Sequence, residues 1–497
     1  MQIVGSLDSL VIHRRSPLTR HFLVSVKLQK LETPGQVAKS SDSSSPIRGS
    51  RIPRRRDDSH VWVRGYRRLM NTIGIGLLGA GTVGGTLIRR LVTEHAAIAA
   101  KTGLDLQIRR VVVRDPEKAR SFDLPEGVLT VDAVAMVDDP DVDLVVEVMG
   151  GRDPAGDLVL RALESGKPVV TANKELIAVM GDQLIAAAER SGVALLFEAA
   201  VGGGIPIIRP LSETLAGERI SRVMGIVNGT TNYILTRMSD DGATYRDALA
   251  QAQELGYAEP DPTADVEGAD AAAKAAILAS LAFGTWVGLD QVPHSGITAI
   301  TAADISHARN LGYAIKLLGI AELTTHGVSA RVHPVLLPLE HPLSTIRGAT
   351  NAIYIEGPSI DKLLFAGPGA GGDPTATAVL GDVIDAAREI LAGAQVAPRI
   401  RFAPSALADF GSVPTKWYVR LEVVDEPGVL AQIAAAFGHA HVSIKSVWQE
   451  GSGDAATLLI VTHQAPESDQ QNALAAVRDL DCVNAVAAAI RVESEES

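Results

Sequence analysis

Short apolar runs alternate with longer amphipathic stretches over the first half of the chain. The runs at residues 72–78, 107–113, 142–148, 168–171 and 194–197 are typical of strands that are buried on both faces. After the first run, Val83, Leu87 and Leu91 fall on one face of a predicted helix. This alternation predicts an α/β fold with a parallel sheet, which we assign to residues 71–205.

The pattern changes after residue 205. Runs at 221–227 and 351–356 predict strands, and runs at 245–255 and 269–283 predict helices. We therefore expect an α+β domain over residues 206–365. A glycine-rich segment at 367–375 opens another predicted helix. We expect this helix to return to the first domain, so that residues 366–395 complete it.

The end of the chain has the order strand, helix, strand, strand, helix, strand. These elements occupy residues 416–491, after a linker at residues 403–415. This order predicts a ferredoxin-like βαββαβ unit. Its first turn, around Gly428, offers free N–H groups at a helix start, where a small carboxylate ligand would bind. The alternative is an oligomerisation module without a ligand.

Composition places the chain among globular α/β proteins. Its 497 residues suit about three domains, and only 4% of them are aromatic. The single cysteine, Cys482, excludes an internal disulfide framework and fits a reducing compartment, which favours the cytoplasm. No run approaches the about 18 apolar residues that a membrane span needs, so we expect no membrane partner.

Basic residues are concentrated near the N-terminus. In residues 1–70, Lys and Arg outnumber Asp and Glu, so the rest of the chain is more acidic than its net charge of −12 indicates. An acidic body argues against nucleic acid as the main partner. We expect residues 1–70 to be a disordered basic extension. The alternatives are an organellar transit peptide, a basic arm for nucleic acid and a translated extension without a folded role.

The strand predicted at 72–78 runs directly into a G-x-G-x-x-G sequence. Its glycines are Gly79, Gly81 and Gly84, and Thr82 and Val83 lie between the last two. Glycine lets such a turn close and lets the backbone approach a pyrophosphate at the helix N-terminus. The position between a strand and a helix predicts a dinucleotide site of the Rossmann type.

The second predicted strand ends in Arg114 and Asp115, where a dinucleotide fold reads the ribose. Arg114 would neutralise the 2′-phosphate of NADP, whereas Asp115 would bind the ribose hydroxyls of NAD. We favour NADP; an arginine that only faces solvent is the alternative. Lys174 follows the strand at 168–171 and is expected at the carboxyl edge of the sheet, where such folds bind ligands.

The stretch from Gly256 to Lys274 holds five carboxylates and one lysine. Two prolines stiffen the loop beside Glu259. Asp270 and Lys274 are four residues apart on a predicted Ala-rich helix, so their side chains can touch. A lysine in a partly apolar cleft suits proton transfer, although a neighbouring carboxylate favours its charged form. The alternative is an exposed ion pair.

Two more segments carry candidate ligands. Glu198 precedes a glycine-rich bend that exposes carbonyl oxygens near one negative charge, as in a site for a hard cation. A domain hinge is the alternative there. Thr230 begins a predicted helix, where it either caps the helix or offers its hydroxyl and N–H to a substrate carboxylate.

In order along the chain, these motifs resemble the homoserine dehydrogenase family. The similar segments, which cover about residues 72–395, are GLLGAGTVGG, TANK, EAAVGGGIP, VNGTTNY, GYAEPDPTADVEGADAAAK and GPGAGGDPTA. The tail resembles the ACT domain, a regulatory amino-acid-binding module. The resemblance implies NAD(P)-dependent interconversion of L-homoserine and L-aspartate 4-semialdehyde, a step toward threonine and methionine. It also implies a homo-oligomer and feedback by an amino acid, for which we expect threonine.

The resemblance further implies roles for single residues. Lys274 matches the proton-transfer lysine, and Asp270 beside it matches a substrate contact and orients the lysine. The other implied contacts are Gly229, Thr230, Glu259 and Asp265 for substrate, Thr82, Val83, Lys174 and Gly371 for cofactor, and Glu198 with the carbonyls of Val201, Gly203 and Ile205 for sodium.

Two other functions remain open from the residues alone. The first is another amino-acid dehydrogenase on the same cofactor fold. The second is a non-enzymatic sensor, in which the tail binds an amino acid and the first domain senses the redox state of its dinucleotide.

Overall fold

The computed structural model describes residues 71–120, 122–393, 399–451 and 456–493. The expectations for residues 1–70 lie outside these residues. All described residues belong to one compact unit, Asp57–Ser497.

Six parallel strands form the first sheet, in the order β3-β2-β1-β4-β5-β6. They are β1 (Thr72–Leu78), β2 (Asp105–Val112), β3 (Leu129–Thr130), β4 (Leu144–Glu147), β5 (Val169–Thr171) and β6 (Leu195–Leu196). This is the strand order of a dinucleotide-binding fold, in which ligands bind where the winding reverses between β1 and β4. The predicted Rossmann-type α/β fold is confirmed.

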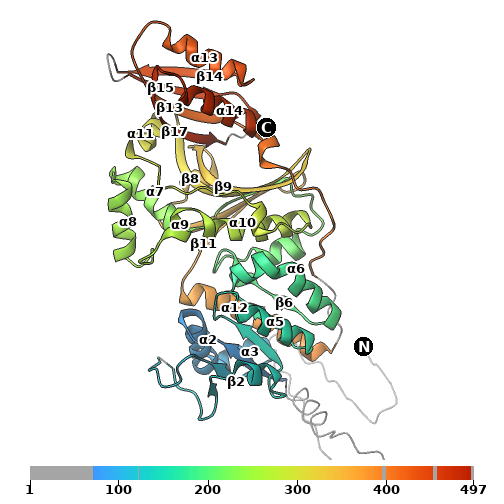
Figure 1. The fold of residues 1–497 in the computed structure, drawn as a ribbon. Helices are drawn as coiled ribbons and strands as arrows, with labels where there is room; N and C mark the ends of the chain where they lie inside the picture. Colours follow the sequence, from blue (N-terminus) through green and yellow to red (C-terminus); the bar gives the residue numbers. More distant parts are fainter. Residues whose placement is uncertain (1–70, 121, 394–398, 452–455, 494–497) are drawn as a thin grey trace, which may run out of the picture. The chain divides into compact units, whose positions relative to one another are not determined.

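Helices cover this sheet. They are α2 (Thr82–Thr93), α3 (His95–Thr102), α4 (Ala133–Asp138), α5 (Ala155–Glu164) and α6 (Lys174–Ser191). A later helix, α12 (Gly372–Ala392), packs against α2 and buries Ala376, Val379 and Val383 in the core that contains β1. Figure 1 shows α12 in orange beside α2 in blue. A segment distant in sequence therefore contributes to the core of the nucleotide-binding fold.

The second sheet has nine strands, in the order β11-β10-β7-β8-β9-β17-β13-β15-β14. The first five in that order belong to the α+β part: β7 (Arg222–Ile226), β8 (Tyr313–Thr324), β9 (Gly327–Pro338), β10 (Thr350–Gly357) and β11 (Asp361–Pro368). The helices of this part are α7 (Gly229–Asp241), α8 (Tyr245–Glu254), α9 (Thr263–Val266), α10 (Ala269–Phe283) and α11 (Ala302–Asn310). Helix α10 packs on β8 and β9.

The long hairpin of β8 and β9 is not among the predicted elements. Lys316, Arg331 and His333 interrupt its apolar pattern, yet all three are buried. The ammonium of Lys316 donates to Oδ1 of Asn232 at 2.9 Å, and Arg331 donates to Glu322 at 2.7 Å. Partners that only the folded chain provides therefore allow these charges in a strand core.

The C-terminal part has the expected βαββαβ order. Its elements are β13 (Trp417–Val423), α13 (Val429–His439), β14 (Ile444–Glu450), β15 (Ala456–Thr462), α14 (Glu467–Arg478) and β17 (Val483–Val492), with a short pair of β12 (Pro414–Thr415) and β16 (Ala465–Pro466) beside them. β17 pairs in parallel with β9, for example at Arg491 and Val335. Arg420 of β13 also donates to Asp304 of α11 at 2.9 Å. The C-terminal unit therefore continues the sheet of the α+β part.

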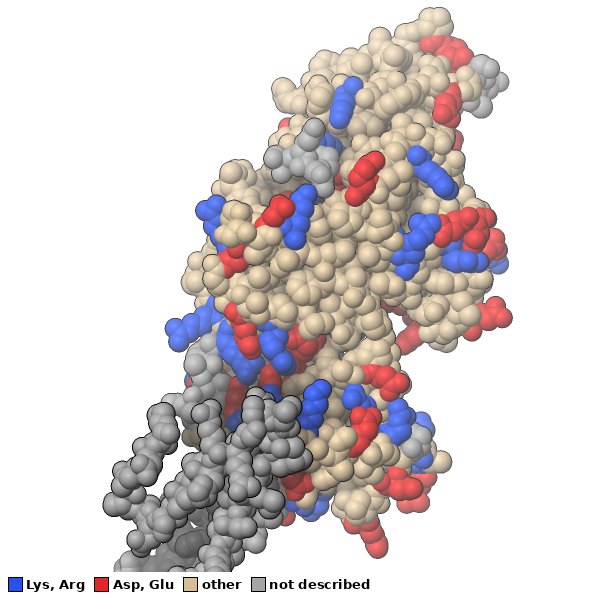
Figure 2. Space-filling model, turned by 180° about the vertical axis from the view of Figure 1, so that it is seen from behind, with Lys and Arg blue, Asp and Glu red and all other residues tan. Residues whose placement is uncertain are grey.

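The surface of this unit carries charged side chains of both signs. On the face seen in Figure 2, acidic and basic side chains are interspersed rather than gathered into a basic stripe. In the described part of the chain, no helix is both long and apolar enough to cross a membrane.

Candidate functional site

The G-x-G-x-x-G turn has the geometry of a phosphate-binding turn. Gly79 has a φ of +105°, and a Cβ there would lie 2.9 Å from the carbonyl oxygen of Val148. A Cβ on Gly84 would lie 2.4 Å from the carbonyl oxygen of Gly79, so glycine is needed for α2 to pack on the turn. A Cβ on Gly81 would meet nothing within 4 Å. The open space at Gly81, at the start of α2, fits a dinucleotide phosphate.

The start of α12 lies beside this turn. Gly371 precedes the helix with a φ of +121°, which favours glycine. A Cβ on Gly372 would lie 3.0 Å from Oγ1 of Thr86 and 3.3 Å from Cγ2 of Thr82. Thr82 and Val83 form the first turn of α2. The structure therefore brings together the glycine-rich segments that sequence analysis expected to hold the cofactor.

Arg114 is exposed just after β2. Its side chain makes no hydrogen bond or ion pair with the residues that the structure describes. Arg120, in contrast, donates to the carbonyl oxygens of Lys118 at 2.7 Å and Pro116 at 3.1 Å. Oδ1 of Asp115 accepts from the backbone N–H of Glu117 at 2.9 Å. Arg114 is thus available for a phosphate at the strand end.

One carboxylate links two lysines from different parts of the fold. Oδ2 of Asp270 lies 2.7 Å from Nζ of Lys274, and Oδ1 lies 3.2 Å from Nζ of Lys174. Lys274 also donates to the carbonyl oxygen of Val227 at 2.7 Å. Lys174 begins α6, whereas Asp270 and Lys274 belong to α10. Lys174, which sequence analysis assigned to the cofactor, therefore lies against the carboxylate beside the predicted proton-transfer residue.

The pair of Asp270 and Lys274 is not an exposed ion pair. Their side chains are only 11% and 12% exposed. Helix α10 is buried over most of its surface because nearly all its residues are Ala, Ile or Leu. The apolar surroundings make each charge dependent on its partners.

Opposing effects set the charges of this cluster. Burial raises the pKa of Asp270, but the positive charges of Lys274 and Lys174 and the hydrogen bonds from Lys274 and Asn228 outweigh it and lower the pKa to about 2. Burial lowers the pKa of Lys174, but the charge of Asp270 more than offsets this and the pKa is raised. Asp270 is therefore ionised and Lys174 protonated at neutral pH.

Asp265 of α9 lies beside this cluster. Its Oδ1 accepts from Nδ2 of Asn228 at 2.7 Å, and its Oδ2 lies 3.4 Å from Oγ1 of Thr230. Burial, together with the charge of Asp270, raises its pKa. Thr230 also donates to the carbonyl oxygen of Tyr257 at 2.5 Å. Gly229 begins α7, and a Cβ there would lie 2.8 Å from the carbonyl oxygen of Ala349.

Asn228 is a residue of this cluster that sequence analysis did not single out. It ends the turn after β7, and its side chain accepts from the backbone N–H of Thr231 as the N-cap of α7. An Asn followed by Gly and two Thr is a recognisable helix start, so the cap was visible in the sequence. The sequence did not show that its side chain contacts the carboxylates of Asp265 and Asp270.

Glu259 lies outside the hydrogen-bonded cluster. It is exposed on the loop between α8 and α9, and its carbonyl oxygen accepts from Nε2 of Gln253 at 3.1 Å. Its carboxylate makes no hydrogen bond or ion pair with the described residues. The structure therefore leaves this predicted substrate contact free at the surface.

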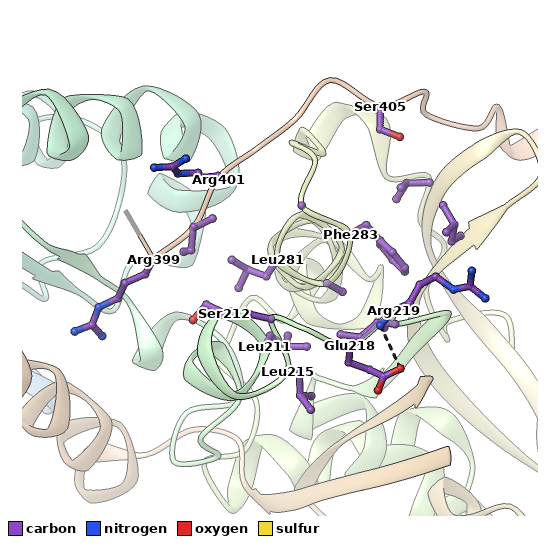
Figure 3. A pocket seen from close by; sticks show the side chains of 17 residues that line it. Leu211, Ser212, Leu215, Glu218, Arg219, Leu281, Phe283, Arg399, Arg401 and Ser405 are labelled. Atoms are coloured by element: carbon purple, nitrogen blue, oxygen red, sulfur yellow. Dashed lines mark hydrogen bonds between the residues drawn. The ribbon is translucent and has the colours of Figure 1, made fainter. Parts of the chain in front are cut away.

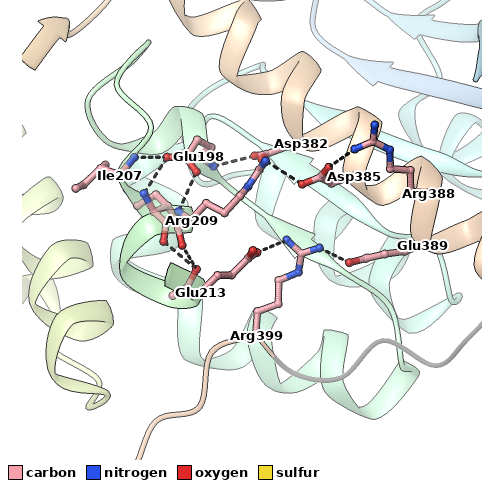
Figure 4. Close-up of polar contacts among 11 residues, drawn as sticks. Glu198, Ile207, Arg209, Glu213, Asp382, Asp385, Arg388, Glu389 and Arg399 are labelled. Carbon is pink, nitrogen blue, oxygen red and sulfur yellow. Dashed lines mark hydrogen bonds and ion pairs between the residues drawn. The ribbon is translucent and has the colours of Figure 1, made fainter. Parts of the chain in front are cut away.

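Backbone N–H groups occupy the carboxylate of Glu198 (Figure 4). Its Oε1 accepts from Ile207 at 2.6 Å and from Ile208 at 2.8 Å, and its Oε2 accepts from Arg209 at 2.9 Å. These N–H groups compensate the negative charge of Glu198, which the sequence analysis expected a bound cation to compensate. No group of three or more His, Cys, Asp or Glu side chains in the described residues is placed to hold a metal. Only backbone oxygens in this segment remain as candidate ligands.

The carbonyl oxygens of the bend after Glu198, unlike its carboxylate, remain available as ligands. Gly202 and Gly203 have φ values of +74° and +56°, which turn the chain sharply. The carbonyl oxygens of Val201, Gly203 and Ile205 accept no hydrogen bond from the described residues. Oxygens of this kind suit a hard cation.

A cavity of about 430 Å³ lies elsewhere in the α+β part (Figure 3). Leu211, Leu215, Leu281 and Phe283 are among its apolar lining residues. No residue of the lysine and carboxylate cluster lines it. In Figure 3, Arg399 and Arg401 are directed away from Leu281. Because none of the residues of the cluster lies in its wall, this cavity does not replace the cluster as the candidate site.

Comparisons with known proteins agree with this geometry. Residues 206–384 match the family description "Homoserine dehydrogenase", residues 79–198 match "Homoserine dehydrogenase, NAD binding domain" and residues 417–482 match "ACT domain".

Individual relatives cover most of the chain. A homoserine dehydrogenase from Corynebacterium glutamicum is 48% identical over 431 residues, which span 86% of this chain and 96% of the relative. The crystal structure of a homoserine dehydrogenase from Thiobacillus denitrificans is 40% identical, with a TM-score of 0.80 over 85% of this chain and 98% of its own.

A more distant solved structure holds a dinucleotide. It is a hyperthermophilic archaeal homoserine dehydrogenase in complex with NADPH, 29% identical with a TM-score of 0.55 over 64% of this chain and 98% of its own. Since the first relative is so similar over nearly its full length, the chain belongs to the homoserine dehydrogenase family of NAD(P)-binding oxidoreductases and carries a C-terminal ACT domain.

Proposed function

We propose that Lys274 exchanges the proton in the interconversion of L-homoserine and L-aspartate 4-semialdehyde. The observation that carries this is the buried ammonium of Lys274, fixed by Asp270 and the carbonyl oxygen of Val227. A lysine ammonium has three N–H donors, so one remains for the substrate oxygen. In the reduction, Lys274 gives its proton to the aldehyde oxygen as the carbon takes up hydride; in the oxidation, it removes the hydroxyl proton.

The neighbouring residues hold the amino-acid end of the substrate. The carboxylate of Asp265 faces the substrate ammonium, and the free N–H groups at the start of α7, at Gly229 and Thr230, receive the substrate carboxylate. Glu259 is exposed and unpaired in the described residues, which supports its role as a second partner of the ammonium. Asp270 orients Lys274 and Lys174.

The cofactor supplies or accepts the hydride when bound. We assign residues 71–205 with 366–395 to cofactor binding, with the phosphates at Gly79, Gly81 and Gly84, the first turn of α2 and Gly371. Arg114 is free to meet a 2′-phosphate, and the archaeal relative was solved with NADPH. Both observations favour NADP over NAD for this enzyme.

A sodium ion is proposed at the bend after Glu198. The unpaired carbonyl oxygens of Val201, Gly203 and Ile205 support it, and Glu198 contributes through its backbone, since its carboxylate is occupied. The ion would fix the bend against the segment at Gly369, whose carbonyl oxygen lies 2.4 Å from the position of a Cβ on Gly203. Sodium addition to the sodium-free enzyme should raise its melting temperature, and potassium should do so less.

Regulation is proposed through the ACT domain. Gly428 has a φ of +95° and starts α13, so an amino-acid carboxylate would meet free N–H groups there. Threonine is the proposed effector, and a homo-oligomer is the proposed assembly. We place the enzyme in the cytoplasm, because a single buried cysteine suits a reducing compartment.

A steady-state assay with NADPH and NADH, each with and without threonine, tests these proposals. We expect homoserine oxidation and semialdehyde reduction with a preference for the phosphorylated cofactor, and inhibition by threonine. Arg114→Ala should raise the KM for NADPH by about tenfold and leave that for NADH nearly unchanged. Gly428→Ala should remove threonine inhibition without lowering kcat. Equal effects of Arg114→Ala on both cofactors would contradict the proposed ribose contact.

A further inference from the structure

The amide of Asn228 bridges the two acidic residues of the site. Its Nδ2 donates to Oδ1 of Asp265 at 2.7 Å and to Oδ2 of Asp270 at 2.9 Å. Asp265 lies on α9 and Asp270 on α10, and the chain folds back between them at Gly268. A single nitrogen therefore contacts both carboxylates.

Other contacts fix the orientation of this amide. Oδ1 of Asn228 accepts from the backbone N–H of Thr231 at 2.9 Å and lies 3.0 Å from its Oγ1. Only an oxygen can accept from the N–H, so the nitrogen must face the carboxylates. Asn228 is 5% exposed, and the preceding residue, Val227, supplies the carbonyl oxygen for Lys274. The end of β7 thus positions both the proton donor and the acids.

Like charges make this bridge necessary. The charged groups that face Asp265 are Asp270 and Lys274 of α10 and Lys174 of α6. Asp270 is paired with both lysines, whereas Asp265 makes no ion pair in the described residues. Without a donor between them, the two carboxylates would repel each other in a partly buried setting.

We propose that Asn228 is a positioning residue that holds the carboxylate of Asp265 toward the substrate ammonium and that of Asp270 against Lys274. This inference rests on the roles proposed above for Asp265, Asp270 and Lys274. Through these two contacts, Asn228 couples binding of the substrate amino group at Asp265 to alignment of the proton donor Lys274 by Asp270.

Two substitutions separate this role from the helix cap. Asn228→Asp and Asn228→Ser both keep an N-cap oxygen for α7, but neither can donate to both carboxylates. Asn228→Ser removes the amide that donates to both carboxylates without adding charge, whereas Asn228→Asp adds a third carboxylate. Thr244→Ala is the matched control, since it removes the side-chain cap of α8 at a position away from the cluster.

The measurements are kcat and KM for homoserine across pH, the Kd for NADPH and the melting temperature. We expect Asn228→Ser to lower kcat/KM by about tenfold or more and Asn228→Asp to lower it further. We also expect the acid limb of kcat/KM in Asn228→Asp to move to higher pH, since a third carboxylate raises the pKa of Asp265. The Kd for NADPH should not change, and Thr244→Ala should keep wild-type kinetics.

Either of two results would overturn the proposal. The first is a kcat/KM within twofold of wild type in Asn228→Ser, which also decides the matter if Asn228→Asp does not fold. The second is a loss of activity that follows melting temperature equally in Asn228→Ser and Thr244→Ala. Wild-type turnover in Lys274→Ala would instead remove the underlying roles, so the two failures are distinguishable.

Discussion

Nζ of Lys274 lies 2.7 Å from Oδ2 of Asp270, one helical turn earlier on α10. Most of the other residues of this helix are apolar and buried. We predict that Lys274→Ala lowers kcat by roughly 10² or more, because the proton donor is lost, while the Kd for NADPH is unchanged. Stopped-flow turnover and cofactor fluorescence measure the two quantities.

Lys274→Arg is the control for this substitution. It keeps a positive charge beside Asp270, but a guanidinium does not release its proton at neutral pH. We expect its kcat to fall nearly as far as that of Lys274→Ala, with a smaller loss of stability. Unchanged turnover in Lys274→Ala would remove the proposed mechanism.

Gly81 and Gly84 provide a matched pair of tests. A Cβ on Gly81 has open space around it, whereas a Cβ on Gly84 would lie 2.4 Å from the carbonyl oxygen of Gly79. We predict that Gly81→Ala weakens NADPH binding about tenfold without lowering stability, since the methyl group occupies the phosphate position. Gly84→Ala should lower the free energy of unfolding by about 1 to 3 kcal/mol. Calorimetry of binding and urea unfolding separate these effects; the reverse pattern would contradict the assigned phosphate position.

Asp382 of α12 predicts a pH dependence of stability. It accepts from the backbone N–H of Glu198 at 2.8 Å and from Arg209 at 2.8 Å, as Figure 4 shows, and burial raises its pKa from 3.8 to about 7. Between these values the folded chain retains a proton that the unfolded chain has released. The resulting stability is full below pH 3.8 and is lost as pH rises through 7.

The free energy of unfolding should therefore fall by about 1 kcal/mol from Asp382 between pH 6 and 8. Asp382→Asn cannot titrate, so its stability should change less over the same range. Urea unfolding of both proteins at pH 6, 7 and 8 measures the difference. Parallel pH dependences would show that Asp382 does not titrate in this range.

The contact between Arg420 and Asp304 predicts how the ACT domain depends on the rest of the fold. The side chains are 11% and 0% exposed, and the distance from Nε to Oδ1 is 2.9 Å. Arg420→Met leaves a buried carboxylate without its cation and should lower the free energy of unfolding by about 3 to 5 kcal/mol. The double variant with Asp304→Asn should recover much of that loss in urea unfolding. A double variant as unstable as Arg420→Met would show that lost packing, not charge, is the cause.

The sequence by itself determined the features that depend on local backbone requirements. The turn at Gly79, Gly81 and Gly84 follows an apolar strand and precedes an amphipathic helix; positive φ requires glycine at Gly79, and close packing requires it at Gly84. The spacing of Asp270 and Lys274 places them on one face of a helix wherever that helix lies. The sequence also predicted the βαββαβ order of the tail and showed the family resemblance. The comparisons then favoured homoserine dehydrogenase over the two alternatives, a non-enzymatic sensor and another amino-acid dehydrogenase.

Only the tertiary structure decided how charges are shared between distant segments. Burial of α10 decided between the cleft and the exposed ion pair that the sequence left open, and the fold brought Lys174 and Asn228 to Asp270 from 96 and 42 residues earlier in the chain. The sequence did not predict the strands around Lys316 or the pairing of β17 with β9, because both depend on contacts between distant segments. A buried charge is tolerated only where partners from elsewhere in the chain meet it, and the order of residues does not state which partners those are.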